Sequence, residues 1–410
     1  MSDLSLRALS LFGLLAIVAI AWLCSTDRRR PPWRVVAWGL GLQLALGVVL
    51  LRTEAGRRFF VAVNEAVNGL VRFTDAGTRF MFGPLEEGGF VFALEVLPII
   101  IFMGSVFGIL YHLGVIQRVV GLLARALARS MGVSGAESLA AVANVFVGMT
   151  EAPLMVRPYL ERMTRSELFC VMTTGMATIA GSVLVAYAKM LGEAEYAGHL
   201  VTASLMSAPA GVLVAKLMLP ETETPLTGAA AGALVERSSV NLIDAASEGA
   251  LAALRLAAYV GGLLIAFVAL VALANAGVET LGGFLGVEGL TLQRIFGVAF
   301  APLALLMGIA PADALEVGSL LGLKTVLNEF LAYQDLAQQI AAGAISERSA
   351  VIASYGLCGF ANFGSLAILI GGMGGMAPSR RGEIAALGMR SILAGTLASA
   401  MTGAVAGLLL

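Results

Sequence analysis

The chain has 410 residues, of which 59% are hydrophobic and only 13% are charged, and its formal net charge is −1. Soluble domains carry about 25% charged residues, so this composition excludes an ordinary soluble protein and indicates an integral membrane protein. The near-neutral charge gives no sign of nucleic-acid binding, and long apolar runs indicate spanning helices rather than the short alternating strands of a membrane barrel.

The first two apolar runs predict spanning helices at residues 4–24 and 35–51. The arginine-rich loop TDRRRPPWR between them is expected in the cytoplasm, which leaves the N-terminus outside. Because the positive cluster follows the first apolar run, that run is not expected to be a cleaved signal peptide. Residues 57–75 mix apolar and polar positions at helical spacing, which predicts a helix along the outer interface or, as the alternative, a solvated linker helix.

Six further apolar runs predict the remaining spanning helices of an all-α polytopic protein with eight crossings. We expect them at residues 90–111, 169–189, 199–219, 259–276, 350–371 and 385–409. Interfacial amphipathic helices are expected at residues 117–130, 241–256 and 292–307. Counting crossings from an external N-terminus places the second basic loop, residues 379–383, in the cytoplasm and the C-terminus outside.

Two other apolar stretches carry a glutamate at their centre, Glu151 in ANVFVGMTEAPLMVRP and Glu329 in LLGLKTVLNEFLAY. A charge at the bilayer centre costs at least about 2.5 kcal/mol, so it needs a partner, a cavity or a function. Interrupted backbone at that depth is tolerated only where it lines a wet cavity or is buried in protein. We therefore predict re-entrant hairpins at residues 136–159, entering from the cytoplasm, and 312–336, entering from the exterior.

Each hairpin is followed by a short charged connection and a helix in which a polar residue lies three positions after a glycine, Thr178 in the first case and Asn362 in the second. Since the hairpins enter from opposite sides, the sequence predicts an inverted repeat, which is the plan of secondary transporters. The expected organisation is a set of N-terminal helices at residues 1–115 together with 258–277, repeat halves at 116–220 and 278–410 that each contain one hairpin, and a linker with an interfacial helix at 221–257.

The chain resembles the concentrative nucleoside transporters in a series of segments between residues 90 and 381. These are VLPIIIF, YHLGVIQ, ANVFVGMTEAPLMVRPYL, MATIAGSVLVAY, SLMSAPAGVLVAKLMLPE, IFGVAFAPLALLMG, LGLKTVLNEFLAY and CGFANFGSLAILIGGMG. The resemblance implies a homotrimer in the cell inner membrane, with outer helices as scaffold and a mobile domain that moves by an elevator-like motion. It implies that residues 1–115 with 258–277 are mainly scaffold and that the two repeat halves carry out transport. It implies ion-coupled uptake of nucleosides into the cytoplasm, with no cofactor besides the coupling ion.

The same resemblance implies roles for twelve residues of this sequence. Sodium is expected at Asn144, Val147, Thr178 and Ile179, mainly through carbonyls and the Thr178 hydroxyl. The nucleobase is expected at Met149, Thr150, Glu151 and Val183, and the ribose at Glu329, Phe360, Asn362 and Ser365. An all-oxygen set suits a hard cation, and a carboxylate with an amide suits vicinal hydroxyls.

One position departs from the family pattern, which usually reads GQTEAP where this chain has GMTEAP. The Met149 thioether does not replace an amide's donors and strong acceptor, so base recognition is in question while sugar recognition is intact. We hypothesise that Met149 loosens the discrimination between uracil and purine bases. The oxygens of Asn144 and Thr178 favour sodium as the coupling ion, with the proton as the alternative.

Other classes of protein fit the sequence less well. A channel or gated pore is the alternative, although a pore needs no acidic pair closing on one solute. An enzyme is not expected, because no nucleophile–base pair or metal-binding cluster accompanies the two glutamates. The chain has no GxxxxGK[ST] motif, which argues against ATP-driven transport.

Overall fold

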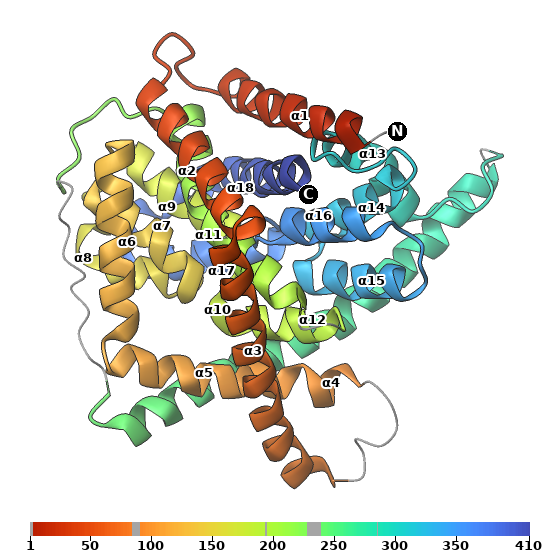
Figure 1. Cartoon of the computed structure of the whole chain (residues 1–410), viewed down its shortest axis with the longest axis horizontal. Coiled ribbons are helices and arrows are strands. Elements are labelled where there is room, and N and C mark those ends of the chain that lie inside the picture. Colours follow the sequence, from red (N-terminus) through yellow and green to blue (C-terminus); the bar gives the residue numbers. More distant parts are fainter. Residues whose placement is uncertain (1–2, 84–90, 193–194, 228–238, 285) are drawn as a thin grey trace.

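The computed structural model describes residues 3–83, 91–192, 195–227, 239–284 and 286–410, and every regular element in these ranges is a helix (Figure 1). Seven helical stretches among these residues are long and apolar enough to cross a membrane. The eighth predicted crossing, residues 350–371, corresponds to two shorter helices with a break between them. The all-α polytopic fold is therefore confirmed; residue 90 and residues 228–238 of the expected linker lie outside the described ranges.

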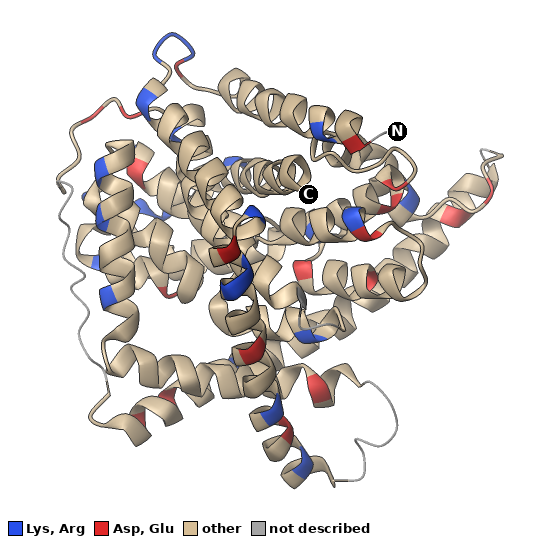
Figure 2. Cartoon of the chain, viewed as in Figure 1, with Lys and Arg blue, Asp and Glu red and all other residues tan. Residues whose placement is uncertain are grey.

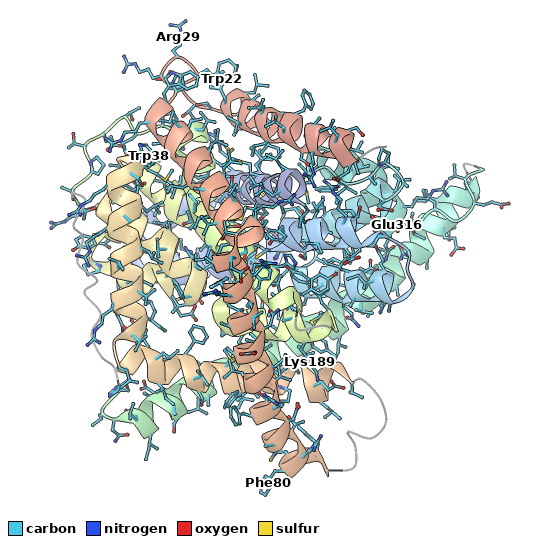
Figure 3. The ribbon with its side chains drawn as sticks, in the orientation of Figure 1. Trp22, Arg29, Trp38, Phe80, Lys189 and Glu316 are labelled. Atoms are coloured by element: carbon cyan, nitrogen blue, oxygen red, sulfur yellow. The ribbon has the colours of Figure 1, made fainter. Side chains whose placement is uncertain are left out.

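The outer helices surround a more deeply buried centre. They are α1 (Asp3–Leu23), α2 (Trp33–Arg52), α3 (Glu54–Phe82), α4 (Phe92–Glu95), α5 (Leu97–His112) and α12 (Leu242–Phe284). In the most apolar window, 22% of the residues are buried in the stretch 92–112 and 17% in α12, against 89% in α11 (Glu195–Met218). Apolar side chains on the outer helices therefore face outward, as Phe80 does at the tip of α3 (Figure 3).

Helices α5 and α12 approach each other through small residues. A Cβ atom added at Gly104 of α5 would lie 2.6 Å from the carbonyl oxygen of Gly249, and one added at Gly249 would lie 2.2 Å from that of Gly104. Such backbone contact without intervening side chains is typical of packed membrane helices. It holds the two helices against each other at the point where both border the central cavity.

Helix α12 corrects one expectation. The predicted interfacial helix 241–256 and the predicted crossing 259–276 form one continuous helix of 43 residues. The junction LRLAAYV contains no proline and no helix-capping residue, so nothing in the local sequence ends the helix there. The stretch predicted as an interfacial helix at residues 241–256 therefore forms the first turns of a spanning-length helix.

The first predicted hairpin and the helix after it form one unit of two interrupted helices. Its elements are α6 (Val115–Met131), α7 (Gly135–Phe146), the 3₁₀ turn η2 (Ala152–Val156), α8 (Arg157–Leu160), α9 (Arg165–Ala177) and α10 (Gly181–Met190). Helix α6 is amphipathic as expected, and its arginines lie on the exposed side (Figure 2). The crossing predicted at 169–189 is not continuous, because α9 stops at Ala177 and Thr178–Ala180 are non-helical.

The second unit repeats this arrangement. Its elements are α13 (Leu292–Leu306), α14 (Ala314–Val326), α15 (Glu329–Ala341), α16 (Glu347–Leu357), α17 (Phe363–Met376), the turn η3 (Pro378–Arg380) and α18 (Arg381–Leu409). The predicted crossing 350–371 is interrupted between Leu357 and Phe363, where Asn362 is extended (φ −146°, ψ 167°) and caps α17 through its side chain. The hairpin also runs five residues beyond its predicted end at Leu336.

The two hairpins begin and end at opposite ends of the molecule. Both ends of the first meet at the buried Lys216, whose Nζ lies 2.7 Å from Glu137 Oε2 and 3.1 Å from Glu221 Oε2; Thr164 Oγ1 donates to the same Glu221 oxygen. Both ends of the second meet where Ser346 Oγ donates to Asp313 Oδ2 at 2.6 Å.

Further hydrogen bonds show which other segments of the chain lie at each of these two ends. At the first, the backbone N–H of Thr26 in the arginine-rich loop donates to the carbonyl of Met218, and Trp22 Nε1 donates to the carbonyl of Arg28 (Figure 3). At the second, Arg348 donates to the carbonyl of Gly407, near the C-terminus. The inverted repeat predicted from the sequence is therefore present in the fold.

Candidate functional site

A cavity of about 1740 Å³ lies between the two interrupted units and helices α5 and α12. All eight residues expected at the substrate line it: Met149, Thr150, Glu151, Val183, Glu329, Phe360, Asn362 and Ser365. They come from the tips of both hairpins and from the breaks in α9–α10 and α16–α17. The structure thus brings these residues together, while their assignment to base and sugar stays a prediction.

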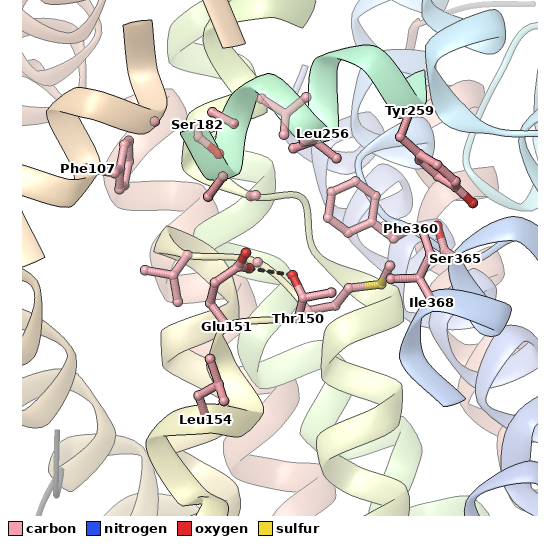
Figure 4. Close-up of a pocket in the computed structure, with 18 of the residues that line it drawn as sticks. Phe107, Thr150, Glu151, Leu154, Ser182, Leu256, Tyr259, Phe360, Ser365 and Ile368 are labelled. Atoms are coloured by element: carbon pink, nitrogen blue, oxygen red, sulfur yellow. Dashed lines mark hydrogen bonds between the residues drawn. The ribbon is translucent and has the colours of Figure 1, made fainter. Parts of the chain in front are cut away.

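Glu151 lies at the tip of the first hairpin and faces the cavity. Helix α7 ends at Phe146, and Gly148 follows with φ +90°, a conformation that reverses the chain and that side-chain-bearing residues rarely adopt. Thr150 Oγ1 donates to Glu151 Oε2 at 2.6 Å (Figure 4). The Glu151 side chain is exposed to the cavity, so its carboxylate is able to accept further hydrogen bonds.

Glu329 at the second tip is enclosed instead, with 4% of its surface exposed. Tyr187 Oη donates to Oε1 at 2.9 Å, and Asn362 Nδ2 donates to Oε2 at 2.8 Å. The other end of the Asn362 amide accepts from the backbone N–H of Ser365 at 2.7 Å. Glu329 also lies in the first turn of α15, where the helix dipole favours a negative charge. These contacts fix the carboxylate between both units.

Tyr187 is a site residue that the sequence analysis missed. It comes from α10 of the first unit, stacks on Tyr333 with ring centroids 4.6 Å apart, and meets the Phe330 ring edge-on at 4.8 Å. A tyrosine hydroxyl buried in an apolar helix needs a hydrogen-bond partner, so Tyr187 in SVLVAYAK carried a usable signal. The identity of that partner depended on the contact between the two units.

Helices α5 and α12 contribute a wall of the cavity that was also missed. Phe107 comes from α5 and lies on the side of Glu151, whereas Leu256 and Tyr259 come from α12, with Tyr259 on the side of Phe360 and Ser365 (Figure 4). Phe107 also contacts the break in the first unit, since a Cβ atom added at Gly181 would lie 2.8 Å from its ring. No local pattern identified these residues, because an apolar or aromatic residue on a spanning helix is usually a packing residue.

The residues expected at sodium lie behind the first tip, and three of them, Asn144, Thr178 and Ile179, are fully buried. Asn144 Nδ2 donates to the carbonyl of Ala140 at 2.9 Å, whereas Asn144 Oδ1 is buried with no hydrogen-bond partner among the described residues. Thr178 caps the end of α9, and Val147 caps the end of α7. Interrupted helices leave carbonyls without N–H partners, and a hard cation binds such neutral oxygens.

The segments that carry these residues lie close together in the fold. The tip of the first hairpin lies directly against the break in α9–α10, because a Cβ atom added at Gly148 would lie 2.8 Å from Ala180 Cβ. One added at Gly175 would lie 3.6 Å from Asn144 Oδ1. The orphaned Asn144 oxygen is therefore directed at the last turn of α9.

Comparison with protein-family models gives three consecutive matches. The description "Na+ dependent nucleoside transporter N-terminus" matches residues 12–85, "nucleoside recognition" (Gate) matches 93–194, and "Na+ dependent nucleoside transporter C-terminus" matches 199–407. Together these models cover nearly the whole chain.

Individual proteins agree with the family models. The chain is 44% identical over 401 residues to the uncharacterized transporter YutK of Bacillus subtilis, covering 97% of this chain and 98% of that one. It is 41% identical over 417 residues to human solute carrier family 28 member 3, covering 98% of this chain and 60% of the relative. The structure of CNTnw in an inward-facing substrate-bound state superposes with a TM-score of 0.92 at 42% identity, covering 98% of both chains.

The close approach at Gly148 generates a test of the first tip. Replacing Gly148 with alanine forces a left-handed conformation, at about 1–2 kcal/mol, and places a Cβ against Ala180, so the melting temperature should fall. Gly343→Ala is the matched control, because Gly343 has φ +62° but no neighbouring atom within 4 Å. Thermal unfolding of the purified variants should show the larger loss for Gly148→Ala; equal losses would contradict the packing described.

Proposed function

The chain belongs to the concentrative, Na+-dependent nucleoside transporter family, and from this premise we propose that it takes nucleosides into the cytoplasm by sodium-coupled symport. The family consists of transporters and not of enzymes. The observation that carries the proposal is the cavity in which the acidic tips of both hairpins meet. A solute in this cavity is bound by both inverted units, as alternating access requires.

We assign the sugar to the second tip. Glu329, Asn362 and Ser365 form one hydrogen-bonded chain, and Phe360 lies beside them in the cavity. Vicinal ribose hydroxyls both donate and accept, so they are suited to a carboxylate and an amide held in fixed positions. A solute lacking these hydroxyls leaves buried polar groups unpaired, which provides selectivity for the sugar.

The base is assigned to the first tip, at Met149, Thr150, Glu151 and Val183. Glu151 accepts from Thr150 and is open to the cavity, so it is available to base N–H groups. Met149 is 7% exposed and supplies an apolar contact where an amide would supply donors. Base recognition on this chain accordingly depends on Thr150 and Glu151 more than on position 149.

Sodium is assigned to Asn144, Val147, Thr178 and Ile179, between the first tip and the α9–α10 break. The support is the buried, unpartnered Asn144 Oδ1, which faces an interrupted helix end. A proton as the coupling ion is the alternative. Sodium is favoured because the oxygens expected as its ligands are side-chain and backbone groups that do not titrate near neutral pH.

The transport step is proposed as an elevator-like movement of the two units against the outer helices, within a homotrimer. The deep burial of α9 and α11 and the low burial of α5 and α12 support such a division. The cavity extends to Arg157, Glu161 and Arg162, at the end that we assign to the cytoplasm. We therefore interpret this conformation as inward-facing, in a multi-pass inner-membrane protein with both termini outside.

Uptake of labelled uridine into proteoliposomes tests the proposal directly. Glu151→Gln and Glu329→Gln should each reduce uptake about 10- to 100-fold, because hydrogen bonds to charged groups contribute about 1.5–3 kcal/mol. Glu316→Gln serves as the control, since Glu316 is exposed on α14 and lies outside the cavity lining (Figure 3). Normal uptake by either tip variant would remove that hairpin from the substrate site. Equilibration without gradient-driven accumulation would indicate a channel.

The coupling ion is tested with Asn144→Leu, which removes the orphaned oxygen at nearly constant volume. Wild-type uptake should follow an imposed sodium gradient, and the variant should lose this response. The measurement is initial uptake rate with sodium or choline outside, at fixed pH. If wild-type uptake instead follows a pH gradient and ignores sodium, the ion is a proton and this assignment of Asn144 is wrong.

Met149→Gln tests base selectivity. Restoring the amide should sharpen the preference between uracil- and purine-containing nucleosides while leaving the ribose requirement unchanged. Competition of uridine uptake by cytidine, adenosine and inosine, in wild type and variant, measures the change. Identical inhibition profiles in the two proteins would show that position 149 does not read the base.

A further inference from the structure

The second hairpin contains a deeply buried lysine to which the proposed transport function assigns no role. Lys324 lies in α14 with 1% of its surface exposed. Lys216 of α11, the other buried lysine among the described residues, has a carboxylate oxygen 2.7 Å from its Nζ, but Lys324 Nζ donates to the backbone carbonyl of Gly356 at 3.0 Å. Burying an ammonium group in a membrane protein is costly, so it implies a specific task.

Gly356 belongs to the last turn of α16, immediately before the break. The final carbonyls of an interrupted helix lack partners and carry a partial negative charge. Around the Lys324 contact, Ser354 O accepts from Tyr333 Oη at 2.9 Å and Leu357 O accepts from the N–H of Gly359 at 2.8 Å. Lys324 thus supplies a cationic donor to a helix end inside the protein.

The corresponding place in the first unit is the proposed sodium site. Asn144 lies three residues before Val147, which caps the end of α7; Lys324 lies three residues before Leu327, which caps the end of α14. Each side chain is directed at the last turn of the interrupted helix that follows, α9 in one unit and α16 in the other. One unit has an unpartnered oxygen at this place, and the other has an ammonium.

We propose that Lys324 is a tethered cation, which takes the place in the second unit that a bound cation takes in the first. This inference rests on the proposed sodium site. The fixed charge holds the α14 side of the second tip against the end of α16, and Glu329 begins α15 directly on the other side of that tip. Lys324 is therefore a positioning residue for the ribose-binding carboxylate, and the second unit needs no ion of its own.

The test replaces the tethered charge in two ways. Lys324→Met removes the charge with little change in length, and Lys324→Asn gives the second unit the residue that the first unit has at this place. In detergent-purified full-length protein, uridine affinity of Lys324→Met should be at least tenfold weaker than that of the wild type. Lys324→Asn should acquire a new sodium response, because its amide oxygen and the α16 carbonyls then form an oxygen site.

The readout for the new response is the rise in melting temperature between choline chloride and sodium chloride at equal concentration. We expect a larger rise for Lys324→Asn than for the wild type or Lys324→Met. The rise should persist in the double variant with Asn144→Leu, which removes the first site. Lys189→Met is the matched control: Lys189 pairs with Glu95 at 3.3 Å outside the cavity, and this variant should show wild-type sodium response and affinity.

Two results would overturn the inference: uridine affinity of Lys324→Met within threefold of the wild type, or an equal sodium response in Lys324→Asn and Lys324→Met. If Lys324→Met does not fold, the sodium-dependent rise in melting temperature is compared between Lys324→Asn and the wild type. An equal rise in the two proteins then contradicts the inference. The melting temperatures are measured without nucleoside, so their outcome does not depend on the proposed substrate. Failure of the wild type to bind uridine would instead contradict the proposed function.

Discussion

The structure depends on how the unpaired backbone N–H and carbonyl groups of helices that end inside the protein are satisfied. Each interruption leaves N–H groups on one side and carbonyls on the other, and inside a membrane protein these groups must find partners or line a cavity. Asn328 and Asn362 satisfy the new N-termini in the second unit, where their side chains accept from Leu331 N and Ser365 N. At the carbonyl end in the second unit, Lys324 donates to the carbonyl of Gly356, and the breaks of both units meet around one cavity.

The two units use the same architecture with different chemistry. The first tip presents Glu151 openly, with one hydrogen bond from its neighbour, whereas the second holds Glu329 between Tyr187 of one unit and Asn362 of the other. The contact between Tyr187 and Glu329 joins the units across the pseudo-symmetric arrangement. Under the proposed assignment, the open carboxylate meets bases of differing shape and the enclosed one meets the constant sugar.

Charged side chains at the two ends of the molecule hold the bases of the two hairpins. Lys216 holds both ends of the first hairpin through Glu137 and Glu221, in a cluster whose side chains are largely buried. At the opposite end, Asp313 and Ser346 close the second hairpin with hydrogen bonds alone. Breaking a buried ion pair leaves an uncompensated charge, so the ion pairs of Lys216 fix the base of the first hairpin. The hydrogen bonds of Asp313 fix the base of the second.

The sequence by itself determined the membrane class, most of the helices, the inverted repeat and the two central glutamates, because hydropathy and isolated charges in apolar runs are local signals. It did not show that residues 169–189 and 350–371 are interrupted, since Thr178 and Asn362 are compatible with either a helix or a cap until their partners are known. It also separated α12 into two helices, and it missed Tyr187, Phe107 and Tyr259. Only the tertiary structure decided these points, because the contacts that give these residues their places join segments far apart in the chain.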